Sequence, residues 1–142
     1  MDGDKIKMTE NTKLQELLDK AASGDTDAQA LINEAACHGL LGFTEETGLS
    51  YLEERAKMDD TNAKERINYA AYFGFLGFTR KTGRAYLEER AKMGDIDAQA
   101  LINYAAYHGL LGFTQETGRS YLEERAKMGD KGAQEWMEIR SK

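Results

Sequence analysis

Apolar and small residues return along this chain with a period of 35 residues. Ala28, Ala63, Ala98 and Ala133 follow this spacing, and so do Gly39, Gly74 and Gly109. Within one period the apolar positions have the i, i+3, i+4, i+7 spacing of a helical face, most clearly at 98, 101, 102, 105, 106 and 109. A period of this length predicts stacked two-helix repeats that bury their apolar stripes against neighbouring repeats.

Each repeat is expected to contain a first and a second helix, best seen in the third copy. The first helix is predicted over 95–108, with Asp95 as its N-cap and Gly109 ending it in a left-handed conformation. The apolar loop 110–113 should return Phe113 and at least one leucine to the core. Thr114 should then cap a second helix over 115–128, whose inward stripe begins at Gly118.

The same pattern divides the whole chain. A half repeat is expected at 12–23, full repeats at 24–58, 59–93 and 94–128, and a final half repeat at 129–142, with a flexible N-terminal segment over 1–11. The fold class is therefore all-α: a right-handed α-α superhelix of about eight helices in one domain. Leu31 and Leu101 are expected in the core, so Arg66 at the equivalent position indicates either a shifted register or pairing with a carboxylate.

Composition and charge narrow the possible partners and compartment. The 142-residue chain has a net charge of −6, which argues against a nucleic-acid binder. Its only cysteine, Cys37, excludes an intrachain disulfide and favours a reducing compartment. The N-terminus lacks the apolar core of a signal peptide, and no apolar run could cross a membrane. We therefore expect a cytoplasmic protein that is monomeric by itself.

Several motifs together resemble the Sel1-like repeat family, a relative of the tetratricopeptide repeat. They are an Ala-Gln pair opening the first helix, a glycine ending it, a loop glycine, a Tyr-Leu pair in the second helix, and a closing Ala-x-x-Gly-Asp, for example Ala98-Gln99, Gly109, Gly112, Tyr121-Leu122 and Ala126 to Asp130. The chain departs from the family where Ile-Asn replaces Leu-Gly in the first helix and where Gly48, Gly83 and Gly118 replace alanine. The resemblance implies adaptor or scaffold work in protein complexes.

Candidate catalytic chemistry is sparse. His38 and His108 occupy equivalent positions, and Phe73 stands there in the middle repeat, which favours packing over ligation. Cys37 and His38 are adjacent, so on a helix their side chains point about 100° apart. No nucleophile with a base, metal-ligand set or phosphate loop is evident, so we expect no catalytic, cofactor or metal site and no enzyme activity.

A better candidate is a polar and aromatic stripe on the first helices, opposite the core. In tetratricopeptide-like solenoids the first helices line the concave face, so these residues are predicted to bind a segment of a partner protein in a groove. The alternative is that they fill the space between repeats. The stripe consists of Asn33, Asn68, Tyr69, Tyr72, Asn103, Tyr104 and Tyr107.

Two charged features suggest further possibilities. The first full repeat carries seven acidic and two basic residues, so the chain could instead be an inhibitor or immunity-type protein that blocks a basic enzyme site through Asp25, Asp27, Glu34, Glu45 and Glu46. The cations Arg80, Lys81 and Arg84 open the second helix of the middle repeat, where they oppose the helix dipole. They either dock an acidic partner segment or balance the acidic first repeat, and we favour the structural role.

The first and third full repeats are nearly identical, which indicates either recent duplication or a designed array. They differ at only five of 35 positions, namely Thr26/Ile96, Glu34/Tyr104, Cys37/Tyr107, Glu45/Gln115 and Leu49/Arg119.

Overall fold

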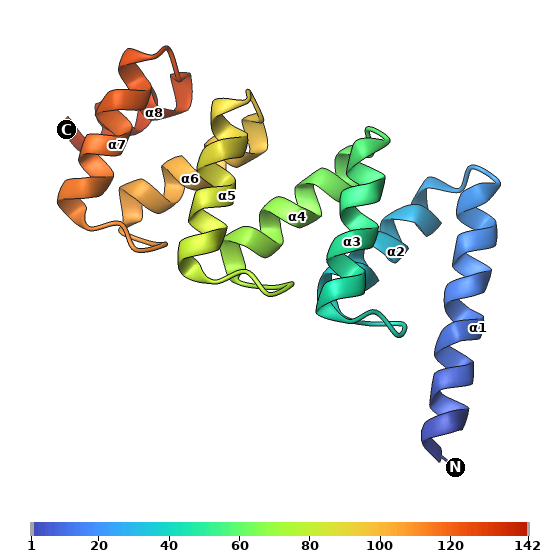
Figure 1. Cartoon of the computed structure of the whole chain (residues 1–142). Helices are drawn as coiled ribbons and strands as arrows, with labels where there is room; N and C mark the ends of the chain where they lie inside the picture. Colours follow the sequence, from blue (N-terminus) through green and yellow to red (C-terminus); the bar gives the residue numbers. More distant parts are fainter. Residues whose placement is uncertain (1, 142) are drawn as a thin grey trace. The chain divides into compact units, whose positions relative to one another are not determined.

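The computed structural model describes residues 2–141, with side chains from Glu10 onwards. This part of the chain forms eight α-helices and no strand (Figure 1). The helices are α1 (Asp2–Ala22), α2 (Thr26–His38), α3 (Glu45–Lys57), α4 (Thr61–Phe73), α5 (Arg80–Lys92), α6 (Ile96–His108), α7 (Gln115–Lys127) and α8 (Lys131–Ser141). The predicted all-α class and number of helices are confirmed.

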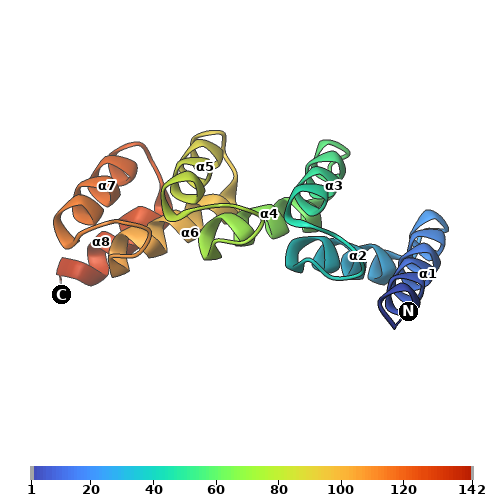
Figure 2. The same ribbon diagram turned by 60° about the horizontal axis from the view of Figure 1, so that its bottom comes forward.

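Within each of two compact units, consecutive helices pack against each other, which is the arrangement of a helical-repeat solenoid. The described residues form two compact units. The N-terminal unit contains residues up to Ala70 together with Phe75–Gly77, and the C-terminal unit contains Ala71–Gly74 and the residues from Phe78 onwards. In the N-terminal unit α1 packs on α2 and α2 on α3. In the C-terminal unit α5, α6, α7 and α8 pack successively, and α8 also contacts α6. Figure 2 shows α6 and α8 on one side of this unit, with α5 and α7 on the other.

The helix ends follow the residues expected to set them. Asp95 accepts a hydrogen bond from the backbone N–H of Ala98 at 3.1 Å, and Thr114 caps α7 through a reciprocal pair of hydrogen bonds with Thr117. Gly109 ends α6 at φ +68°, in the left-handed region that glycine adopts without strain. The predicted caps are therefore confirmed.

Each unit buries the predicted small and branched residues. In the C-terminal unit the core combines Ile102 and Leu122 with Phe113, which returns from the loop and is only 4% exposed. Leu111 packs against the same core, whereas its neighbour Leu110 is 42% exposed. One leucine of the loop thus folds inward, as expected.

Glycines in the second helices allow an unusually close contact with the first helices. A Cβ atom at Gly118 would lie 1.9 Å from the carbonyl oxygen of Ala106, and one at Gly48 would lie 2.1 Å from that of Ala36. Since these obstacles are backbone atoms, they cannot rotate away. The glycines that depart from the family pattern are therefore required by the close packing of the helix pair.

Two expectations about the helices need correction. Helix α1 begins at Asp2, ten residues before the predicted start at residue 12, because good helix formers such as Lys5, Lys7 and Met8 continue the helix without a proline. Leu31 is 51% exposed and does not belong to the core, because its position lies at the margin of the apolar stripe. Arg66 can therefore occupy the equivalent site without a shift of register.

Among the described residues, no helix is both long enough and apolar enough to cross a membrane.

Candidate functional site

The asparagines of the predicted stripe are buried in the protein. Asn33, Asn68 and Asn103 are each at most 1% exposed. In the N-terminal unit the side-chain amide of Asn33 donates to Asp60 Oδ2 at 3.1 Å and to Asn62 Oδ1 at 3.0 Å. In the C-terminal unit Asn103 donates to Asp130 Oδ2 at 3.1 Å. Each donor therefore reaches the start of the next first helix.

The acceptor aspartate joins three elements of the repeat. Asp60 accepts from the N–H of Ala63 at 3.2 Å as the N-cap of α4, and its other oxygen binds Arg55 of α3 at 3.1 Å. Burial raises the pKa of Asp60, but the hydrogen bonds from Asn33, Ala63 and Arg55 outweigh it and the net pKa is lowered. Asp130 repeats this arrangement with Arg125 at 3.5 Å.

The pairs Asn33–Asp60 and Asn103–Asp130 therefore form an internal polar lock between repeats. All three asparagines are buried, so the prediction that they line an open groove is wrong. A buried amide N–H must find an acceptor inside the protein, and for Asn33 and Asn103 the aspartate at the next N-cap provides one. The Oδ1 atom of Asn103 has no hydrogen-bond partner among the described residues. A sequence signal for this role exists, since each asparagine precedes an aspartate by 27 residues: Asn33 and Asp60, Asn68 and Asp95, Asn103 and Asp130.

The tyrosines behave differently, because several reach the surface of the C-terminal unit. Tyr104 is 45% exposed, and its ring centroid lies 4.3 Å from that of His108 and 6.1 Å from that of Trp136. Tyr107 is half-buried and lies 4.4 Å from Trp136. We refer to Tyr104, Tyr107, His108 and Trp136 as the aromatic cluster.

Two further side chains extend the aromatic cluster. Tyr72 packs against the same core, and its pKa is raised by burial and by the proximity of Tyr104. The guanidinium of Arg140 lies 5.3 Å from the centre of the Tyr107 ring, a cation–π geometry. The structure thus brings together Tyr72, Tyr104 and Tyr107 of the predicted stripe with Trp136, which was not part of that stripe.

The N-terminal unit contains a smaller ring cluster at the end of α2. Tyr69 stacks on Phe75 with centroids 5.7 Å apart, and His38 meets the Phe75 ring edge-on at 5.2 Å. Cys37, at the position of Tyr107, is buried, and its thiol donates to the carbonyl oxygen of Arg66 at 3.7 Å. The two histidines therefore lie in ring contacts, as the packing interpretation predicted.

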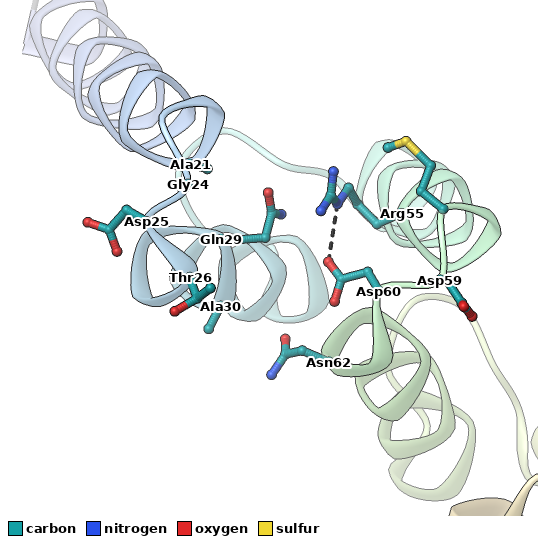
Figure 3. A pocket seen from close by; sticks show the side chains of 11 residues that line it. Ala21, Gly24, Asp25, Thr26, Gln29, Ala30, Arg55, Asp59, Asp60 and Asn62 are labelled. Carbon is teal, nitrogen blue, oxygen red and sulfur yellow. Dashed lines mark hydrogen bonds and ion pairs between the residues drawn. The ribbon is translucent and has the colours of Figure 1, made fainter.

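The N-terminal unit also has a hollow of about 390 Å³ beside the lock, lined in part by charged side chains. Figure 3 shows Arg55 and Asp60 joined across its wall, with Gln29 and Asn62 nearby. Asp59 at its rim binds Lys64 at 2.6 Å. Since Asp60 pairs with Arg55 and Asp59 pairs with Lys64, these charges at the hollow are already neutralised within the protein. The hollow is therefore the place where the lock reaches the surface.

The acidic residues that would act in an inhibitor or immunity-type protein are divided between structural and surface positions. Asp25 is the N-cap of α2 and accepts from Ala28 N–H at 3.0 Å. Glu34, Glu45 and Glu46 are exposed. Within residues 10–141 no group of three or more His, Cys, Asp or Glu side chains is placed to hold a metal ion.

Comparisons of this chain with protein-family models, curated proteins and solved structures find no match.

Proposed function

We propose that this chain is a non-enzymatic scaffold that holds a segment of a partner protein against its aromatic cluster. The observation that carries the proposal is the exposure of Tyr104, an aromatic residue in the middle of α6 that is 45% exposed and surrounded by other rings. Tyrosine and tryptophan supply large contact areas at little cost in side-chain entropy, and they dominate the energetics of protein interfaces.

The repeat fold itself does not require this tyrosine. At the equivalent position of the first repeat stands Glu34, which is also exposed, in a helix with the same length, N-cap and C-cap. Since folding accounts for neither the ring nor its exposure, binding is the simpler explanation. The resemblance to Sel1-like repeats, whose members act as adaptors, supports the same proposal, as does the expectation of a cytoplasmic protein.

The test is selection of binding peptides from a random displayed library, followed by affinity measurement on matched variants. Tyr104→Glu introduces the residue that the first repeat already carries, so the fold should tolerate it. We expect the affinity of selected peptides to fall by about 2 kcal/mol, roughly 30-fold. Tyr104→Phe, which keeps the ring, should retain most of the affinity.

The matched control is Ile96→Thr, which also introduces the residue of the first repeat, Thr26. Ile96 is 79% exposed and lies at the opposite end of α6 from His108, so its loss should leave peptide binding unchanged. Equal affinities for Tyr104→Glu and wild type would refute the proposed site. Binding that weakens steeply with salt and ignores Tyr104 would favour the acidic inhibitor instead.

A further inference from the structure

A second hollow, in the C-terminal unit, is lined by cations. It has a volume of about 410 Å³ and lies between the start of α5 and the loop before α7. We call it the basic hollow. Its lining residues are Arg80, Lys81, Arg84, Ala85, Glu88, Leu111 and Gly112.

One of the three cations has a structural role. The Nε of Arg84 donates to Glu88 Oε1 at 2.9 Å, and its guanidinium lies 3.5 Å from the centre of the Phe113 ring. A longer contact of 3.5 Å joins Arg84 Nη1 to the carbonyl oxygen of Leu111. Arg84 therefore anchors the loop, and its charge is balanced by Glu88.

The other two cations are not accounted for by the fold. Arg80 and Lys81 are exposed, and neither forms an ion pair within the part of the chain that the structure describes. The first turn of α3 carries Glu45 and Glu46 at these positions, which is the charge that the helix dipole favours. The first turn of α5 has no acidic residue, so the substitution costs helix stability.

The capping box at the start of α5 already uses the backbone N–H of Thr82, and the charged side chains are the main feature that the hollow offers to a ligand. The Thr79 hydroxyl accepts from the N–H of Thr82 at 3.1 Å, and the Thr82 hydroxyl accepts from the N–H of Thr79 at 2.8 Å. The floor is apolar, formed by Ala85 and Leu111. A Cβ at Gly112 would lie 3.8 Å from both Arg80 Cδ and Arg84 Nη1, so the glycine leaves room between these side chains and the loop.

We infer that the basic hollow docks a segment of a partner protein that carries adjacent carboxylates. Two uncompensated cations above an apolar floor match the charged ends and methylene stems of neighbouring glutamates. Because Glu88 balances the charge of Arg84, the hollow keeps a net charge of about +2, from Arg80 and Lys81, for a ligand to neutralise. Such a small charged patch suits a short acidic segment better than a long polyanion. This inference is independent of the aromatic cluster.

The experiment measures binding of a fluorescent hexaglutamate peptide at low ionic strength to the full chain. Wild type is compared with Arg80→Glu/Lys81→Glu, which restores the charges found at Glu45 and Glu46. The expected loss of affinity is about tenfold, the size expected for two exposed ion pairs. The same variant should unfold at an equal or higher urea concentration than wild type, because its charges now suit the helix dipole.

The control is Arg119→Glu/Lys127→Glu, which changes the net charge equally on exposed positions of α7. It should keep the wild-type affinity for hexaglutamate, and so should Tyr104→Glu. The inference is overturned if wild type does not bind the peptide, or if Arg80→Glu/Lys81→Glu binds it equally well. It is also overturned if an oligonucleotide of equal charge displaces the peptide preferentially, or if sedimentation shows that the cations pair a second copy of the chain.

Discussion

Replacing Gly118 by alanine should loosen the contact between α6 and α7. The new Cβ would lie 1.9 Å from the carbonyl oxygen of Ala106, whereas a carbon and an oxygen normally approach to about 3.3 Å. The helices would have to separate by about 1.4 Å to relieve the clash. A gap of this size forfeits about half of the dispersion energy across the contact.

The cost can be estimated from the core that this contact seals. Ile102 and Leu122 are both fully buried, and each would lose about 1.5 kcal/mol if a third of its contacts were weakened by half. Alanine gains about 1 kcal/mol over glycine in helix propensity. The expected net loss in the free energy of unfolding for Gly118→Ala is therefore about 2 kcal/mol.

Gly132 provides the matched control because it also lies inside a helix, α8. A Cβ there would find its nearest neighbours, Asn103 Nδ2 and Asp130 Oδ1, at an ordinary 3.4 Å. Gly132→Ala should therefore raise the stability by up to about 1 kcal/mol. Urea unfolding followed by circular dichroism measures both changes. If Gly118→Ala is as stable as wild type, the close approach of α6 and α7 is not the reason for the glycine.

Three other predictions concern the core and the lock. Leu87→Ala should cost about 2–5 kcal/mol because the side chain is fully buried, whereas Leu17→Ala, in the half-buried face of α1, should cost less in the same urea assay. Asn33→Ala should cost about 1–3 kcal/mol because it leaves the lock unsatisfied, and a cost near zero would contradict the lock. The pKa of Asp60 is lowered in the folded protein, so its ionised carboxylate stabilises the fold at pH values above its unfolded pKa of about 3.9. The free energy of unfolding should therefore fall as the pH drops below that value. In Asp60→Asn the loss of stability at low pH should be smaller than in wild type. An unchanged loss would show that other carboxylates cause it.

The sequence alone was sufficient for the helix ends within the repeats, although not for the start of α1. The 35-residue period, the caps Asp95 and Thr114 and the terminating Gly109 predicted helix ends that the structure confirms. These signals act between residues close in the chain, so their effect can be read without knowing the tertiary fold.

The face on which each residue of the stripe lies was decided only by tertiary packing. Helical spacing grouped Asn103 with Tyr104 and Tyr107, yet the first is sealed against Asp130 while Tyr104 is exposed. A difference of one residue turns a side chain by about 100°, and the position of the next first helix determines which side is covered. That position depends on how closely the helices approach, hence on contacts such as Gly118 with Ala106, which hydrophobic periodicity does not encode.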